Sequence, residues 1–173
     1  MFARPFGRLS AALFFVFMAL SVTPSSAGEL PRPEGKVLLT VEGKIANTTD
    51  GRAALFDRAQ LEAMGLQELR TSNPFVEQVH TYEGVLLSKI LDAVGVEGET
   101  LVARALDGYN VDVPVEDVRK YPVILAMKQD GKVLRVRSKG PLWIIYPVDQ
   151  HEELRAESFS GRSIWQLTTL TVK

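Results

Sequence analysis

Runs of apolar residues divide the chain into short elements separated by polar turns. Aliphatic and β-branched runs predict strands over 37–41, 101–106, 109–113, 123–128, 133–137, 142–146 and 163–172. Apolar residues at helical spacing predict short helices over 58–64 and 115–120. They also predict a helix that ends at Gly95 and that either is capped by Ser88 or begins slightly earlier. We therefore expect an α+β fold with a mixed, mainly antiparallel and barrel-like sheet and about three short helices.

Glycine, proline and acidic residues mark the connections between these elements. Asp57 is placed to cap the first helix, and Gly65 and Gly95 are placed to end the first and second helices. Residues 71–74 are expected to form a loop, because the residue before Pro74 is disfavoured in helical conformation. We expect hairpin turns at Asp107-Gly108 and over 129–132, and a polar loop over 148–161.

The first 27 residues have the pattern of an export signal. Arg4 and Arg8 precede an uncharged apolar run over 11–22, and Ser25-Ser26-Ala27 supplies small residues for cleavage. The run is shorter than the ~20 residues of a spanning helix, although an uncleaved anchor is an alternative. We expect a cleaved secretory signal peptide over 1–27 and a single periplasmic domain over 28–173.

Composition narrows the chemistry that this domain can perform. Lys and Arg number 20 against 21 Asp and Glu, which leaves no basic excess for nucleic acid binding. The 46% hydrophobic content favours a packed core over disorder. The chain has no cysteine and two histidines, so disulfides, thiolate nucleophiles and zinc knuckles are excluded and a histidine metal site is disfavoured.

Five sequence blocks in order resemble the sulfite-oxidase-type molybdopterin-binding family. They are 82–87 (YEGVLL, followed by Ile90, Leu91 and Gly95), 106–114 (LDGYNVDVP), 124–131 (ILAMKQDG), 139–147 (KGPLWIIYP) and 162–167 (RSIWQL). Together they span most of residues 37–172. The resemblance implies this family's fold and a pocket for a pterin.

Two departures from the family pattern bear on function. The oxidases bind molybdenum through a cysteine thiolate, which this chain lacks, and the arginine expected after Gly140-Pro141-Leu142 is Trp143. The chain is more similar to exported, cysteine-free, pterin-binding regulators of the PruR-like type. That resemblance implies that a free dihydro- or tetrahydropterin is the ligand and that no metal is bound. It also implies a partner, the periplasmic domain of an inner-membrane GGDEF/EAL protein that makes or degrades cyclic di-GMP.

A pterin is a flat bicycle, so aromatic side chains and one carboxylate are the groups expected to bind it. The aromatic candidates are Tyr109, Trp143, Trp165 and Phe75, and the carboxylate is Asp107. Each has a structural alternative. Asp107 can be an ordinary turn residue, Tyr109 a sheet-face aromatic, Trp165 a core anchor and Phe75 a lid on the core. Trp143 and Tyr146 have opposite parity in one strand, and we expect Trp143 to face the ligand.

Cations and one acidic loop complete the candidates. Lys139 and Arg162, together with Arg137, can form a rim that contacts the ligand's carbonyl or hydroxyl groups, or they can be solvated. His80 is expected to be structural. The loop from Asp149 to Glu153, with Arg155, can contact a partner protein or remain solvated.

These residues leave three functions open. The first is a pterin sensor that relays ligand binding to a membrane partner, with no catalytic residues and no metal. The second is a periplasmic molybdopterin-dependent oxidoreductase of the sulfite oxidase type, disfavoured because soft metals prefer thiolate ligands. The third is a structural partner with an empty pocket.

Overall fold

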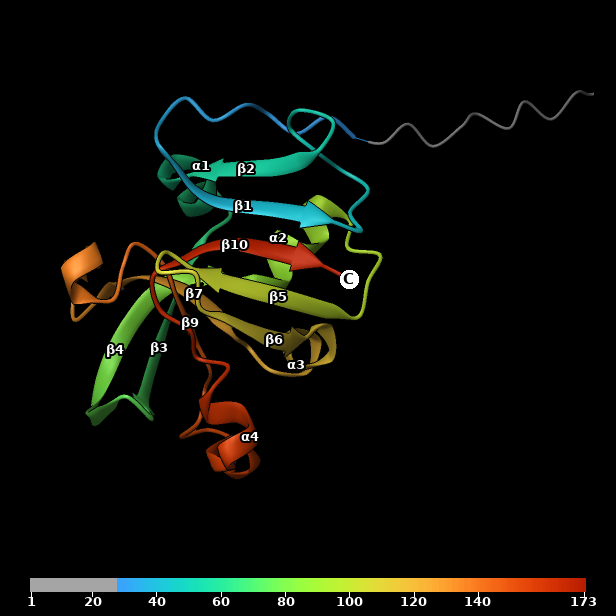
Figure 1. Ribbon diagram of the computed structural model, residues 1–173. Helices are drawn as coiled ribbons and strands as arrows, with labels where there is room; N and C mark the ends of the chain where they lie inside the picture. Colours follow the sequence, from blue (N-terminus) through green and yellow to red (C-terminus); the bar gives the residue numbers. More distant parts are fainter. Residues whose placement is uncertain (1–27) are drawn as a thin grey trace, which may run out of the picture.

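Two five-stranded β-sheets form the frame of the molecule in the computed structural model, which describes residues 28–173 (Figure 1). The first sheet has the order β2 (Ala53–Asp57), β1 (Val37–Gly43), β10 (Leu167–Val172), β5 (Thr100–Ala105) and β6 (Asn110–Pro114). In this sheet β1 and β10 pair in parallel, and the other neighbours are antiparallel. The sheet is therefore mixed, as the sequence predicts.

The second sheet is antiparallel throughout and carries a long hairpin. It is built from β3 (Leu66–Asn73), β4 (Val76–Leu86), β7 (Ile124–Gln129), β8 (Lys132–Val133) and β9 (Trp143–Ile145), and both β8 and β9 pair with β7. In Figure 1 the β3–β4 hairpin projects away from the first sheet, toward the lower left. Its tip thereby lies at one side of the molecule, where it can form the wall of a site.

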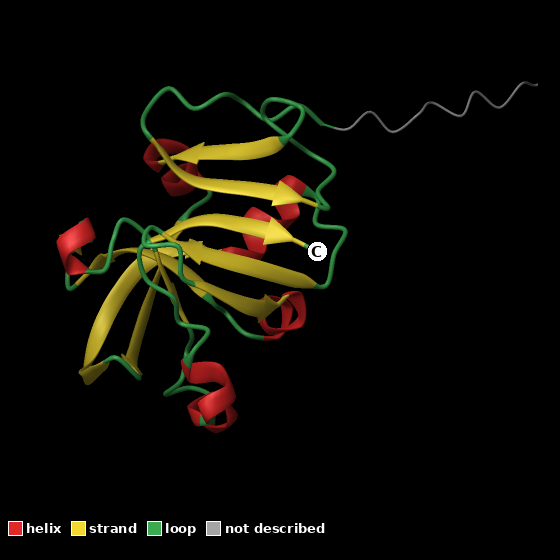
Figure 2. Ribbon diagram, in the orientation of Figure 1, coloured by secondary structure: helices red, strands yellow, loops and turns green. Residues whose placement is uncertain are grey.

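Helices in the described residues are short, and Figure 2 shows them around and behind the sheets. They are α1 (Arg58–Ala63), α2 (Leu87–Val94), α3 (Val115–Lys120) and α4 (Glu157–Ser160), with 3₁₀ turns η1 (Val136–Ser138) and η2 (Glu152–Arg155). The Asp57 side chain accepts from the Gln60 amide in a capping box, so Asp57 is the predicted cap. Gly95 ends α2 in the left-handed conformation, also as predicted.

Two hydrophobic clusters stabilise the fold, and successive side chains over 143–146 alternate between them. The larger cluster contains the buried face of α2 and inward residues of both sheets, including Ile144 and Tyr146. The smaller one contains Tyr82, Trp143 and Ile145. Trp143 and Tyr146 therefore face opposite sides, which confirms the parity prediction.

Four local predictions are wrong, for physical reasons. Residues 71–73 belong to β3, where Thr71 and Asn73 are buried, so polar residues hide the alternation. The predicted strand 133–137 ends at Val133, because the chain turns into η1. Residues 163–166 precede β10 rather than join it, and the loop 148–161 contains η2 and α4.

The predicted fold class is confirmed: the molecule is α+β, with mixed and mainly antiparallel sheets. The sheets form no closed barrel within residues 28–173.

No helix within residues 28–173 is long and apolar enough to cross a membrane. The predicted signal peptide, residues 1–27, lies outside the described residues.

Candidate ligand-binding site

A pocket of about 260 Å³ lies where three distant segments meet. The β3–β4 turn contributes Phe75, the β5–β6 turn contributes Asp107 and Tyr109, and the segment before β10 contributes Trp165. The full lining is Phe75, Ala105, Asp107, Tyr109, Gly161, Ser163, Ile164 and Trp165. The structure thus brings together four of the seven residues that the sequence singles out.

Asp107 occupies both of its predicted environments, because the β5–β6 turn is also the pocket edge. Its Oδ1 accepts a hydrogen bond from the Tyr109 amide at 3.0 Å, and Gly108 adopts a positive φ of 89°. The Gly108 amide donates to the Ala105 carbonyl at 3.1 Å. This Asx turn holds an exposed carboxylate beside the exposed Tyr109 ring. The carboxylate retains capacity to accept further donors from a ligand.

Phe75 and Trp165 form the aromatic wall of the pocket. Their ring centroids are 4.8 Å apart at an interplanar angle of 81°, an edge-to-face pair. Phe75 is 41% exposed, and its amide donates to the Asn73 side-chain oxygen at 2.9 Å. It lines the pocket and is absent from both core clusters, so it is a wall of the pocket and not a lid on the core.

Lys139 packs against this aromatic wall but is not among the residues that line the pocket. Its Nζ lies 4.9 Å from the Trp165 ring centroid and 5.7 Å from that of Phe75, and it donates to the Phe75 carbonyl at 3.3 Å. Burial lowers the pKa of the Lys139 amine, whereas the aromatic faces attract its ammonium form. Lys139 is thus placed to hold the Phe75 turn against Trp165.

Trp143 does not face the pocket, which corrects the sequence-based expectation. Its side chain is fully buried in the smaller cluster, its Nε1 donates to the Ser163 carbonyl at 3.1 Å, and its ring meets Tyr82 edge-on at 5.5 Å. The family arginine is replaced at a position that in this chain lies inside a core. Trp143 therefore supports the Ser163 wall of the pocket from within.

Arg162 is also committed to structure rather than to a ligand rim. Its Nη1 lies 2.6 Å from Asp117 Oδ2, and the same oxygen accepts from the Tyr146 hydroxyl at 3.0 Å. The Arg162 guanidinium also stacks 4.6 Å over the Phe159 ring. Burial, followed by the Asp117 charge, raises the pKa of Tyr146. Asp117 gave no signal in the sequence, because acids in the first turn of a short helix are normally solvated.

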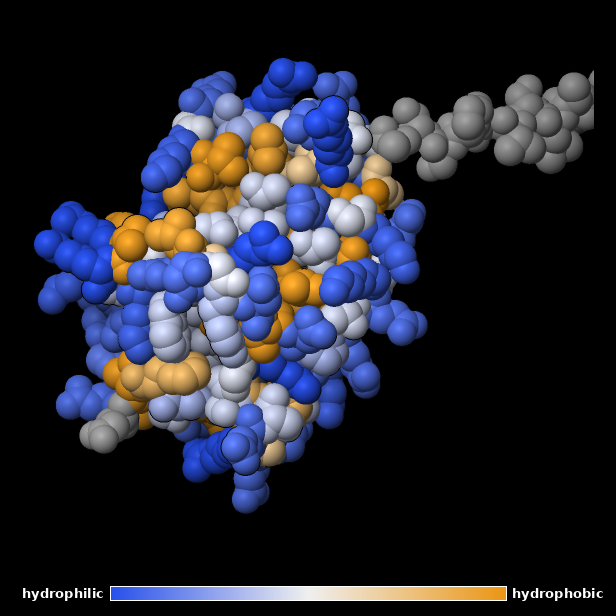
Figure 3. Space-filling model, viewed as in Figure 1, coloured by the Kyte–Doolittle hydropathy of each residue, from blue (hydrophilic) through white to orange (hydrophobic). Residues whose placement is uncertain are grey.

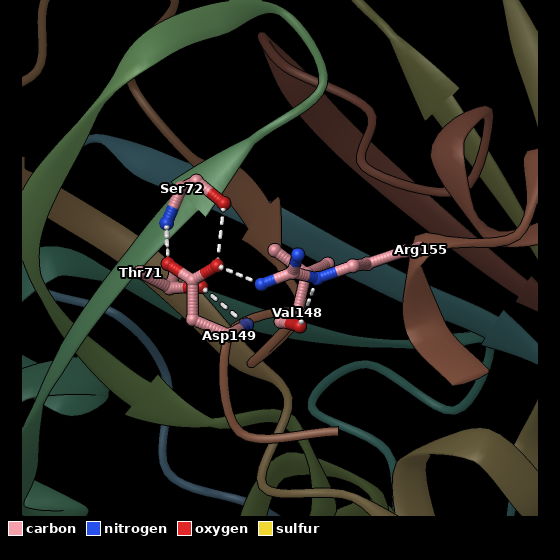
Figure 4. A network of polar contacts seen from close by, with 5 residues as sticks. All are labelled: Thr71, Ser72, Val148, Asp149 and Arg155. Carbon is pink, nitrogen blue, oxygen red and sulfur yellow. Dashed lines mark hydrogen bonds and ion pairs between the residues drawn. The ribbon is translucent and has the colours of Figure 1, made fainter. Parts of the chain in front are cut away.

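Asp149 joins the 148–155 segment to the end of β3 (Figure 4). It accepts from the Ser72 amide and, at 2.8 Å, from the Ser72 hydroxyl, and Arg155 Nη2 donates to it at 3.1 Å. The Ser72 amide is the main cause that lowers the pKa of Asp149. Ser72 lies three residues before Phe75, so this junction fixes the root of the pocket's aromatic turn. The sequence showed the charges of this loop but not their internal use.

His80 has the structural role that the sequence analysis expects. Its Nδ1 lies 2.6 Å from Asp130 Oδ2, and this contact joins β4 to the β7–β8 turn. No group of three potential metal ligands occurs in the part of the chain that the structure describes.

The fold is the α+β arrangement of the sulfite oxidase type. Residues 56–149 match the family described as the oxidoreductase molybdopterin binding domain, and the chain belongs to that family. Among 28 solved chains that match is the sulfane dehydrogenase SoxCD from Paracoccus pantotrophus, at 19% identity and a TM-score of 0.57. That alignment covers 84% of this chain and 40% of the dehydrogenase chain. The search of curated proteins gave no match.

The residues present do not fit the molybdenum centre that the family name implies. The sulfite-oxidase-type centre needs a cysteine thiolate, and the chain has no cysteine. The pocket instead offers aromatic rings and a single carboxylate, Asp107. Aromatic rings and a carboxylate are groups that can bind a flat heterocycle with hydrogen-bond donors on its edge.

Proposed function

We propose that the chain is an exported pterin-binding protein that senses a free reduced pterin. The observation that carries the proposal is the convergence of Phe75, Tyr109, Trp165 and Asp107 on one pocket in a molybdopterin-binding fold. The proposal is supported by a pocket whose groups are of the kind that bind a flat heterocycle, and by the absence from the chain of a cysteine thiolate for molybdenum.

The chemistry of the pocket matches the two sides of a pterin. The faces of a flat bicycle pack against aromatic rings, and each such contact contributes about 0.5–1.5 kcal/mol beyond area burial. The N3–H and the 2-amino group of the ring both donate, and a carboxylate such as Asp107 accepts from both. We therefore assign Asp107 to the hydrogen-bonding edge of the ligand, and Phe75, Tyr109 and Trp165 to its faces.

The regulatory part of the proposal rests on resemblance to the cysteine-free regulators. In this proposal the signal peptide over 1–27 directs the chain to the periplasm. The pterin-bound domain then contacts the periplasmic domain of an inner-membrane GGDEF/EAL protein and alters cyclic di-GMP turnover. The chain itself catalyses no reaction.

A periplasmic molybdopterin-dependent oxidoreductase is the second candidate. The family match and the similarity to a sulfane dehydrogenase favour it. At 19% identity that similarity is evidence for the fold alone, and the missing cysteine argues against the activity.

Native mass spectrometry of the protein purified from the periplasm distinguishes these functions. We expect an added mass that fits a metal-free pterin, confirmed by fluorescence after release. Asp107→Ala should abolish this mass, whereas Asp112→Ala, an exposed acid on the neighbouring strand β6, should retain it. A molybdenum-containing adduct would support the oxidoreductase. A bare polypeptide that also fails to bind added reduced pterins would indicate a structural partner.

A further inference from the structure

Exposed large hydrophobic side chains gather on one side of the molecule. Val37, Leu106 and Val136 are 37%, 57% and 51% exposed, and all three line one groove of about 260 Å³. Phe75 and Tyr109, at 41% and 58% exposed, line the candidate pterin pocket. Isolated exposed apolar residues are ordinary, but a contiguous group of them marks an interaction site.

The groove adjoins the pterin pocket through a shared turn. Leu106 lines the groove, while Asp107 and Tyr109 of the same turn line the pocket. The Leu106 amide donates to the Gln166 carbonyl at 2.9 Å, and the Gln166 side chain donates to the Val136 carbonyl at 2.7 Å. Gln166 follows Trp165 directly, so one short stretch of chain supports both the groove and the pocket.

Cations lie in the groove and next to it. The segment 132–139 has four cations and no acid. Lys36 lines the groove, and Arg135 and Arg137 flank Val136 in the chain and line the neighbouring hollow. None of the ion pairs found within residues 28–173 involves these three residues. In Figure 3, orange atoms gather at the left near the start of β1 and the end of β5, and blue atoms project beyond them. An apolar centre with a charged border is the usual build of a protein interface.

We propose that this groove is the docking surface for a partner protein segment that inserts apolar side chains between Val37, Leu106 and Val136. Carboxylates on that segment would meet Lys36, Arg135 and Arg137, since opposite charges at the rim steer association and fix register. The docking surface is argued from the groove itself. Only the identity of the partner, the protein that the sensor regulates, rests on the proposed function. Because the turn Leu106–Tyr109 serves both sites, ligand binding and partner docking are coupled, and the coupling acts equally in both directions.

A second copy of the chain is a poorer occupant than a different protein. The chain's own acidic stretch, 149–157, carries Glu152, Glu153 and Glu157 on its surface. Its one large aliphatic side chain, Leu154, is buried at 1% exposure. This stretch therefore offers carboxylates without the exposed apolar groups that the groove needs.

Site-specific photo-cross-linking tests the proposal with the full-length chain in its own host. A benzophenone amino acid replaces Val136 or, in a second variant, Leu106. The matched control carries it at Val79, a 45% exposed valine on β4 that lines neither the groove nor the pocket. Mass spectrometry then identifies the cross-linked peptide. We expect positions 136 and 106 to capture one segment of another protein that combines acidic and apolar residues, and position 79 to leave that segment uncaptured. Adding Arg137→Glu to the variant labelled at position 136 should reduce the yield on the order of tenfold.

Other outcomes overturn the proposal. Cross-links to a second copy of this chain would make the groove a self-association surface, and cross-links to anionic phospholipid would make it a membrane contact. A yield no higher than at Val79, or one unaffected by Arg137→Glu, would also refute the proposed partner. Pterin binding is measured separately on purified Arg137→Glu protein and should stay within about twofold of wild type, since Arg137 lies outside the pocket lining. A wild-type chain that captures the acidic segment but binds no pterin would refute the proposed function and leave the docking surface intact.

Discussion

Ser72 donates two hydrogen bonds to Asp149, one from its amide and one from its hydroxyl, although the residues are 77 positions apart. The bonds join the end of β3 to the segment 148–155 (Figure 4), and Phe75 follows Ser72 by three residues. One carboxylate thereby anchors the strand end that leads into the Phe75 wall of the pocket. A change at Asp149 should thus affect a ligand that it does not contact.

Removal of the Asp149 carboxylate should weaken pterin binding. We expect Asp149→Ala to lower the affinity for a reduced pterin on the order of tenfold, because the Phe75 turn loses its anchor. The affinity of Asp149→Asn should lie between those of wild type and Asp149→Ala, since the introduced amide oxygen still accepts one of the two Ser72 hydrogen bonds. Fluorescence titration measures the affinity. Asp92→Ala, which breaks the exposed pair with Arg119, is the control and should bind normally. Wild-type affinity in Asp149→Ala would show that the junction does not shape the pocket.

The same carboxylate should contribute to the acid sensitivity of the fold. The Ser72 amide lowers the pKa of Asp149 below its usual 3.8. Its contribution to the free energy of unfolding is therefore present above pH 3.8 and is lost as pH falls through the lower folded-state pKa. The stability difference between wild type and Asp149→Asn should shrink over that range. Urea unfolding at a series of pH values measures it, and a difference independent of pH would contradict the assignment.

Arg162 should be needed for stability and not for ligand affinity. Arg162→Ala leaves the mostly buried Asp117 with only the Tyr146 hydroxyl as a partner, which should cost about 1–3 kcal/mol of unfolding free energy. Arg119→Ala removes an exposed pair and should cost no more than about 1 kcal/mol. Chemical unfolding gives both values. If Arg162→Ala were as stable as wild type but failed to bind pterin, Arg162 would belong to the ligand rim after all.

The two tryptophans should separate binding from folding. Trp165→Ala removes a pocket wall and should abolish detectable pterin binding. It should lower the free energy of unfolding by less than Trp143→Phe does. Trp143→Phe leaves the Ser163 carbonyl without its buried donor, which should cost about 1–3 kcal/mol of unfolding free energy. Thermal unfolding and ligand titration on both variants test this. If Trp143→Phe lost pterin binding and Trp165→Ala lost only stability, Trp143 and not Trp165 would be the residue that contacts the ligand.

The sequence predicted the parts of the fold in which a local pattern and the tertiary environment agree. The β5–β6 hairpin has a strong turn signal, and α2 has strong periodicity and a glycine at its end, and the structure has both elements. Ser88 does not cap α2, because the helix begins slightly earlier, at Leu87, without a side-chain cap. Strand β3 was missed because Thr71 and Asn73 occupy its inward positions, and their burial depends on partners distant in sequence. Four pocket residues could be named because the family resemblance implied a flat ligand, for which aromatic rings and a carboxylate are the expected groups. Trp143, Arg162, Asp149 and Asp117 could not be assigned, since only the packed structure shows which charges and rings face inward.

The pocket is assembled from Phe75, the turn at Asp107–Tyr109 and the segment ending at Trp165, which together span about half of the chain. A fragment cut within that span lacks at least one wall, so a chain truncated there or only partly folded has no complete site. Ligand binding therefore stabilises only the native state, by an amount that grows with pterin concentration. If the chain is the proposed sensor, its action on the partner depends on the fraction of correctly folded chains as well as on the pterin concentration. Chains that are unfolded or truncated within that span bind no ligand and so give no response.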